Sequence, residues 1–169
     1  FKDAWNIDQM GGVWKRLPYT YTLMLIGTLA LTGFPFLSGF YSKDAIIEFA
    51  YLKGTSIGYY TCSVGVFTAF LTAIYSWRLF FKTFFGEYNN KSIPIEKTHE
   101  SPLVMIIPLI MLAIGALAAG YLFKELLIGN NSTFWGESIL FLNFVKFENF
   151  PIWLIIITPV VIIIAIPLA

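Results

Sequence analysis

Five long apolar runs follow one another along the chain, separated by shorter polar stretches. None has the segments of about ten alternating residues that are typical of a membrane β-barrel. Most have about the twenty residues that a helix needs to cross the hydrocarbon core of a bilayer. The pattern predicts helices at about 17–34, 36–53, 58–85, 102–122 and 151–169. We therefore expect an all-α membrane protein, a polytopic transmembrane helix bundle with about five spans, one of them discontinuous.

The second run, 36–53, differs from the others because it holds Lys43, Asp44 and Glu48 between apolar flanks. Counted from a turn at Pro35, Lys43 lies about 12 Å deep, close to the middle of a hydrocarbon core about 30 Å thick. Ionisable residues at that depth are costly and mark ion or proton pathways. Two alternatives stay open: 36–53 is a surface helix and not a span, or Asp44 and Glu48 only mark where the helix emerges.

Weak helix formers precede Lys43 in the sequence: Gly33, Pro35, Ser38 and Gly39. They predict an interruption of the second helix between Ser38 and Lys43. Transporters often build their sites from such broken helices. Desolvation disfavours the charged form of an amine, so Lys43 is predicted to be a proton relay. Asp44 is the assisting acid, and Glu48, four residues on and on the same face, is a weaker candidate.

Composition agrees with a membrane protein and excludes several functions. Only 12% of the 169 residues are charged, whereas soluble domains are about a quarter charged. The net charge of +1 indicates no nucleic-acid partner. There is no CxxC, His/Cys cluster or Walker loop, so neither a redox cofactor nor a metal site is expected in this chain. Cys62 is predicted to be a packing residue. The sequence opens on Phe1 and closes inside an apolar run, so we interpret it as a piece of a longer polypeptide.

The charges outside the second run suit the ends of the spans. Arg78 and Lys82 close the third run and are expected to be interfacial anchors. The polar loop 86–101 holds His99, a candidate for taking up protons, although a lone loop histidine is ordinarily just solvated. Five alternating spans would place six basic residues on one side and four on the other, so the positive-inside rule does not decide the orientation.

Three motifs together resemble a known family. They are LPYTYTLMLIGTLALTGFPFLSGFYSKDAIIE at 17–48, the MGGVWKRLP that overlaps its start, and the SWRLFF…FFGE end of the third run. This combination resembles the large antiporter-like subunit of proton-pumping NADH–quinone oxidoreductase, chain L in bacteria and chain 5 in mitochondria. The resemblance covers roughly 8–125, and 126–169 match only in hydropathy. The GFYSKD motif is fairly specific, because the related cation/proton antiporter subunit tends to read SKE.

The resemblance implies a proton-translocating membrane subunit of the respiratory NADH–quinone oxidoreductase, coupled to electron transport without a cofactor of its own. Residues 1–125 would end the antiporter-like domain, and 126–169 would begin a C-terminal extension. Lys43 matches the relay lysine of a discontinuous helix in that family, and Asp44 matches the acid beside it. The implied partners are the lipid bilayer and other membrane subunits of the oxidoreductase. The implied location is the bacterial cytoplasmic membrane or the mitochondrial inner membrane, with the 86–101 loop on the cytoplasmic or matrix side.

Two other functions remain open from the sequence. One is the large subunit of a multisubunit cation/proton antiporter, driven by an ion gradient. The other is a structural membrane anchor of a redox complex, in which Lys43 would be dispensable.

Overall fold

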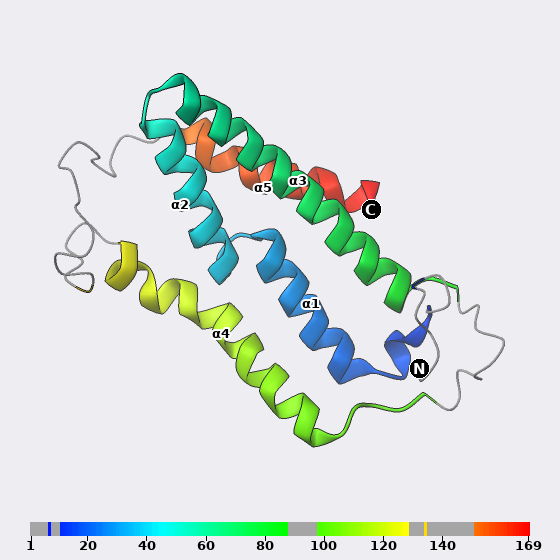
Figure 1. Ribbon diagram of the computed structural model, residues 1–169. Helices are drawn as coiled ribbons and strands as arrows, with labels where there is room; N and C mark the ends of the chain where they lie inside the picture. Colours follow the sequence, from blue (N-terminus) through cyan, green and yellow to red (C-terminus); the bar gives the residue numbers. More distant parts are fainter. Residues whose placement is uncertain (1–6, 8–10, 88–97, 129–133, 135–150) are drawn as a thin grey trace.

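The computed structural model describes residues 7, 11–87, 98–128, 134 and 151–169. That part of the chain contains five α-helices, a short 3₁₀-helix and no β-strand (Figure 1). The all-α class is therefore confirmed, and each helix lies where an apolar run predicts one. The 3₁₀-helix η2 spans Val13–Lys15, and the α-helices are α1 (Pro18–Thr32), α2 (Ser38–Leu52), α3 (Ser56–Phe84), α4 (Leu103–Ile128) and α5 (Ile152–Leu168).

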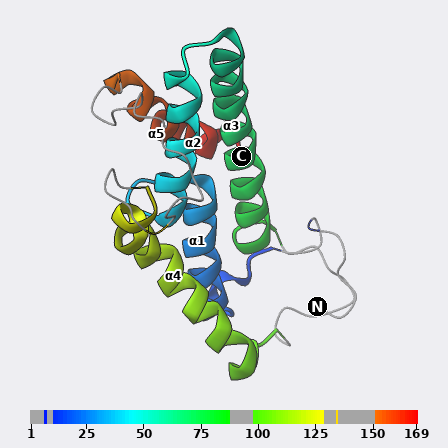
Figure 2. The same cartoon turned by 60° about the vertical axis from the view of Figure 1, so that its left-hand side comes forward.

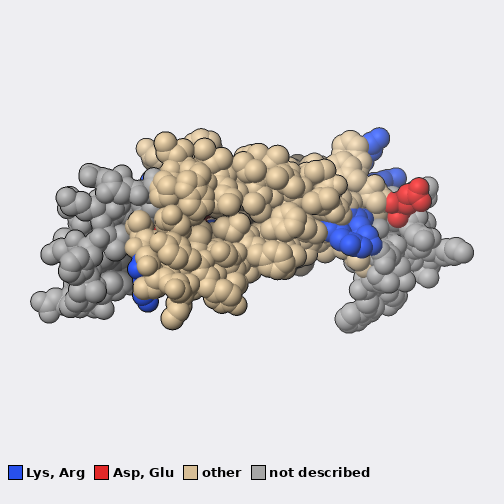
Figure 3. All heavy atoms as spheres, turned by 90° about the horizontal axis from the view of Figure 1, so that it is seen from above, with Lys and Arg blue, Asp and Glu red and all other residues tan. Residues whose placement is uncertain are grey.

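The helices are apolar on their outer faces as well as inside. By length and hydropathy, Ser56–Phe84 and Leu103–Lys124 are each able to cross a membrane, with mean hydropathies of 1.5 and 2.6, and α5 is a shorter apolar helix. Large apolar side chains such as Phe67 and Leu112 are 60% and 70% exposed. On the face shown in Figure 3, charged side chains gather toward the two ends. Such a surface suits lipid contact in the middle and water at both ends.

The connection between α1 and α2 is a short turn with a clear local cause. α1 ends where Gly33 adopts the left-handed conformation, with φ 86°, which glycine adopts without a steric penalty. The amides of Gly33 and Phe34 then donate back to last-turn carbonyls at 3.2 and 3.0 Å, a common way to end a helix. Pro35 has no amide to continue the helix. The helix is therefore interrupted over 33–37.

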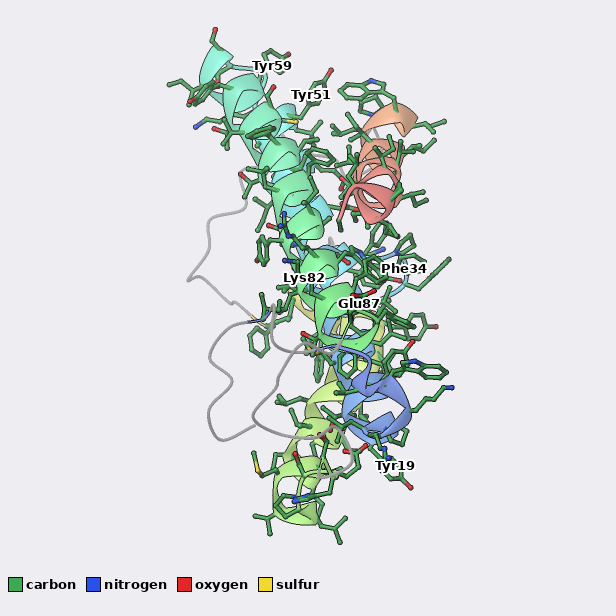
Figure 4. All side chains as sticks on the ribbon, turned by 90° about the vertical axis from the view of Figure 1, so that its right-hand side faces the viewer. Tyr19, Phe34, Tyr51, Tyr59, Lys82 and Glu87 are labelled. Carbon is green, nitrogen blue, oxygen red and sulfur yellow. The ribbon has the colours of Figure 1, made fainter. Side chains whose placement is uncertain are left out.

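α1 and α2 follow one another along a single line beside α3 (Figures 1 and 2). Near the start of α1, the ring centroids of Tyr21 and Phe84 are 5.2 Å apart. Near the end of α2, those of Tyr51 and Tyr59 are 5.3 Å apart. Figure 4 shows Tyr51 and Tyr59 together at one end of the molecule and Tyr19, in the first turn of α1, near the other. α3 therefore runs antiparallel to both α1 and α2.

The lengths of these helices differ in a way that bears on how they could cross a membrane. α1 and α2 have 15 residues each, which gives about 22 Å per helix, too short for a hydrocarbon core of about 30 Å. α3 has 29 residues and is about 43 Å long. The runs at 17–34 and 36–53 therefore form two short helices placed end to end, neither of which is long enough to cross the core alone.

The predicted break between Ser38 and Lys43 is wrong. α2 is unbroken from Ser38 to Leu52, and the interruption lies before it. Ser38 and Gly39 occupy the first turn of α2, where the amides have no partner within the helix in any case. Weak helix formers are tolerated there, and Gly33 with Pro35 suffice to stop α1.

The remaining helices enclose the interruption. α4 contacts both α1 and α2, while α5 packs against α3 and α2. α5 buries one face at helical spacing, comprising Leu154, Thr158, Ile162 and Ala165. Ile162 and Ala165 belong to the main core, with aromatic residues of α3 such as Trp77, Phe80 and Phe84. Cys62 is buried with Ile47 and Leu154 in a smaller cluster, as predicted for a packing residue.

Candidate functional site

The candidate site is the interruption between α1 and α2, where Lys43 reaches back to α1. Lys43 is partly buried on α2, and its Nζ donates a hydrogen bond to the backbone carbonyl of Leu31. The helical partner of that carbonyl would be the amide four residues later, but this residue is Pro35, which has none. The lysine therefore occupies a carbonyl that the proline leaves free. The end of α1 also favours a cation, because the helix dipole is negative there.

Two glycines allow the half-helices to meet this closely. A Cβ atom added at Gly39 would overlap the carbonyl oxygen of Ala30, the residue before Leu31. A Cβ added at Gly33 would lie 3.4 Å from Cδ of Lys43 and 3.8 Å from Cδ1 of Ile162 on α5. Gly33 and Gly39, predicted as helix-breaking residues, thus bring the end of α1 against α2 and the lysine stem.

Asp44 is adjacent to Lys43 in sequence but points to another face of α2. Its side chain is only 6% exposed, and the Thr158 side chain of α5, which is 2% exposed, lies beside it. Neither carboxylate oxygen has a hydrogen-bond partner among the described residues, so Thr158 is a neighbour of the carboxylate and not a hydrogen-bond donor to it. A buried acid with so little compensation is costly, which is typical of functional sites.

A second pair of charges lies one turn further along α2. Glu48 interacts electrostatically with Lys124 of α4, and the Lys124 ammonium lies 5.3 Å from the ring centroid of Tyr41. α4 comes this close because it presents Gly120, where a Cβ would lie 2.6 Å from Cα of Ser38. Ionisable side chains therefore follow α2 from the interruption toward its C-terminal end.

Sequence reasoning missed Lys124 and Thr158. From the sequence, Lys124 is placed in a loop, because the fourth apolar run ends at 122. In the structure α4 continues to Ile128, so Lys124 is helical. Thr158 carries the only hydroxyl in 151–169, which is a signal that could have singled it out. Neither residue is near Lys43 in sequence, so only the packing of α4 and α5 brings them to α2.

The structure does not bring His99 to this site. Its Nδ1 lies 3.0 Å from the carbonyl oxygen of Glu100, next to the start of α1. Because α1 is about 22 Å long, His99 and Lys43 lie at opposite ends of it, and the role of His99 in proton uptake stays a prediction. Arg78 is exposed near the end of α3, where an interfacial anchor is expected. Among the described residues, no three His, Cys, Asp or Glu side chains form a group that could hold a metal ion.

The fold and the site together define a class. Apolar helices with apolar outer faces form a bundle, and the interruption between α1 and α2 lies next to the ionisable side chain of Lys43. This is the architecture of helical membrane transporters, which use broken helices to hold ions and protons away from water.

Comparison with known proteins identifies the relatives. Residues 2–72 match a family model described as "NADH:quinone oxidoreductase/Mrp antiporter, TM". The chain is 45% identical to NADH-ubiquinone oxidoreductase chain 5 of Marchantia polymorpha over 140 residues, 83% of this chain and 21% of the relative. It is 44% identical to chain 5 of Chondrus crispus over 156 residues, 87% and 23% of the two chains.

The chain is therefore a homologue of NADH-ubiquinone oxidoreductase chain 5 along most of its own length, which confirms the resemblance stated from the sequence. The matched stretch is longer than 8–125, the range over which the resemblance was expected. The chain spans about a fifth of the length of these curated relatives.

Proposed function

We propose that this chain is a segment of a proton-translocating membrane subunit of NADH–quinone oxidoreductase, and that Lys43 is its proton relay. The observation that carries the proposal is the hydrogen bond from the Lys43 ammonium to the Leu31 carbonyl. A charge at mid-depth costs at least about 2.5–3.5 kcal/mol, and a free carbonyl at a helix C-terminus is a natural way to offset this cost. A structural lysine would be expected at the interface, where its charge needs no such partner.

The geometry supports a simple division of roles. Nζ of Lys43 holds a proton while it donates to Leu31, and it becomes neutral when the proton leaves. Asp44 and Glu48 lie on the C-terminal side of Lys43 along α2, and Glu48 faces Lys124. These carboxylates are placed to exchange protons with the relay on that side. The proton that reaches Lys43 from the other side would come from groups outside this chain.

In the complete subunit, electrons would pass elsewhere, and this chain would hold no redox cofactor. The proposed partners are other membrane subunits of the oxidoreductase and the lipid around them. The chain would act as part of an enzyme, NADH:quinone oxidoreductase, and catalyse no redox step itself. The relatives named above are chain 5 proteins of eukaryotes, which supports the mitochondrial inner membrane over the bacterial cytoplasmic membrane.

The end-to-end arrangement of α1 and α2 also supports an orientation. Lys15 and Arg16 precede α1, and Arg78 and Lys82 lie near the end of α3 beside them. The opposite end has Lys53 after α2 and Lys124 near the end of α4. Positive charge is enriched on the inner side of membranes. We infer that the start of α1 faces the matrix or cytoplasm.

The test is replacement of Lys43 in the full-length chain within its assembled complex. Lys43→Ala should lose proton pumping and much of the coupled electron transfer while the complex still assembles. The matched control is Lys53→Ala, because Lys53 is exposed just after α2, and it should pump normally. Proton uptake into vesicles is measured together with NADH oxidation. Near-normal pumping by Lys43→Ala would overturn the relay assignment and favour the structural anchor.

A cation/proton antiporter is the second candidate, because the matching family model is named for both kinds of protein. In that case Lys43→Ala would abolish proton movement driven by a cation gradient in vesicles without NADH. Proton movement that depends on NADH oxidation, and not on an imposed cation gradient, would exclude this candidate.

A further inference from the structure

We propose that Glu100 is a positioning residue for the relay, holding α1 so that the Leu31 carbonyl stays within reach of Lys43. The inference rests on the proposed function of Lys43. It assigns a role to an acid at the far end of α1, about 18 Å along the helix from Leu31.

The N-terminus of α1 lacks a cap of its own. The residue at the N-cap position is Leu17, which makes no side-chain hydrogen bond, and the first turn has no acid. Pro18 has no amide, and the Tyr21 amide bonds to the Leu17 carbonyl at 2.8 Å. The amides of Tyr19 and Thr20 are left without partners in the helix.

Glu100 satisfies both amides from 80 residues away. Its Oε1 accepts from the Tyr19 amide at 2.7 Å and from the Thr20 amide at 3.4 Å. Its Oε2 accepts from the Thr20 hydroxyl at 2.7 Å. A carboxylate at a helix N-terminus is also favoured by the helix dipole. One side chain therefore caps α1, and it belongs to the segment that leads into α4.

α1 is consequently held by opposite charges at its two ends, Glu100 at the start and Lys43 at the finish. When the lysine loses its proton, its hydrogen bond to α1 weakens, but the bonds from Glu100 remain. The carbonyl of Leu31 then stays in place for the next proton. Without Glu100, the start of α1 would lose these directional hydrogen bonds to the segment that leads into α4, and apolar contacts, which are non-directional, would have to hold it in place.

α4 and the segment that leads into it contact both α1 and α2, on the two sides of the interruption. Just before α4 begins, Glu100 holds the start of α1. Three-quarters of the way along α4, Gly120 and Lys124 contact α2. The same helix therefore fixes both α1 and α2, which sets the distance between Lys43 and the end of α1.

The test compares Glu100→Ala with the control Glu87→Ala in the full-length chain within its assembled complex. Glu87 is an exposed acid just after α3. Amide hydrogen exchange is measured for 19–22 and for 33–41, alongside pumped protons per NADH oxidised. In Glu100→Ala, exchange of 19–22 should rise about tenfold or more, because charge-assisted hydrogen bonds are lost. Exchange of 33–41 should also rise, and pumped protons per NADH should fall at least about twofold. Glu87→Ala should change none of these.

If Glu100→Ala does not assemble, Thr20→Val tests the same role of Glu100 more mildly, because it removes only the hydrogen bond from the Thr20 hydroxyl to Oε2 of Glu100. It should raise exchange at 33–41 and lower the proton ratio more mildly, and Thr20→Ser should restore both. Faster exchange at 19–22 alone, with 33–41 and pumping unchanged, would make Glu100 a simple helix cap and overturn the inference. The proposed function is tested separately: normal pumping by Lys43→Ala would overturn the relay. In that case, the hydrogen exchange of 33–41 in Glu100→Ala would still show whether Glu100 positions α1.

Discussion

Gly39→Ala is the substitution that tests most directly how the site is built. In a helix, Gly→Ala ordinarily stabilises by about 0.5–1 kcal/mol, because alanine loses less backbone freedom on folding. At Gly39 the new Cβ would overlap the Ala30 carbonyl oxygen, a backbone atom that cannot rotate aside. The ends of α1 and α2 would have to separate by roughly an ångström, as in other overpacked cores.

The magnitude follows from that separation. Overpacking costs about 1–3 kcal/mol. The hydrogen bond from Lys43 to Leu31 would not survive a displacement of this size, because such bonds weaken beyond about 3.2 Å. A hydrogen bond to a charged group contributes about 1.5–3 kcal/mol. Even after the gain in helix propensity, Gly39→Ala should cost roughly 2–5 kcal/mol and lose most proton pumping.

Gly27→Ala is the matched control, because Gly27 lies in the middle of α1 and a Cβ there meets nothing within 4 Å. The midpoint of thermal unfolding of the assembled complex and proton uptake per NADH oxidised are measured for both variants. Gly27→Ala should be neutral or slightly stabilising and should pump normally. Equal unfolding midpoints and equal pumping in the two variants would refute the close approach of the two half-helices.

Three further predictions concern charged and polar side chains of α2, α5 and α3. Lys43→Arg should fail to pump, because guanidinium can still bond the Leu31 carbonyl but does not release its proton at physiological pH; normal pumping by this variant would make Lys43 only a cap for α1. Asp44→Asn should be milder than Lys43→Ala in vesicle proton uptake, and Thr158→Val should resemble Asp44→Asn, with Thr158→Ser close to wild type. If Asp44→Asn were as severe as Lys43→Ala, the acid would carry the proton itself. Arg78→Ala should assemble and pump normally in the same assay, and a loss of pumping in an assembled complex would move the site toward α3.

The local features of the site were already present in the sequence. The apolar runs predicted all five helices, because their length and hydropathy reflect what lies inside a hydrocarbon core. Gly33 and Pro35 predicted an end to a helix near Lys43, since left-handed backbone and a missing amide act within a few residues. Pro35 also leaves the Leu31 carbonyl, four positions earlier, without its helical partner, although the prediction did not extend to that carbonyl.

The exact place of the interruption was harder to predict, because Ser38 and Gly39 are equally poor helix formers in isolation. Whether they break a helix or begin one depends on their surroundings. Gly39 has no side chain, so the Ala30 carbonyl can approach it closely. This tertiary contact, and not helix propensity, explains why a glycine lies at the start of α2.

Only the tertiary structure decided that α1 and α2 lie end to end beside one long helix. That depends on α3, whose Tyr59 and Phe84 pack at opposite ends of the pair. It also placed Glu100 at the start of α1, and Lys124 and Thr158 beside α2. These partners are separated by dozens of residues, so no helical or turn periodicity links them. Hydropathy and propensity act along the chain, whereas the partners of a buried charge are set by which helices pack together.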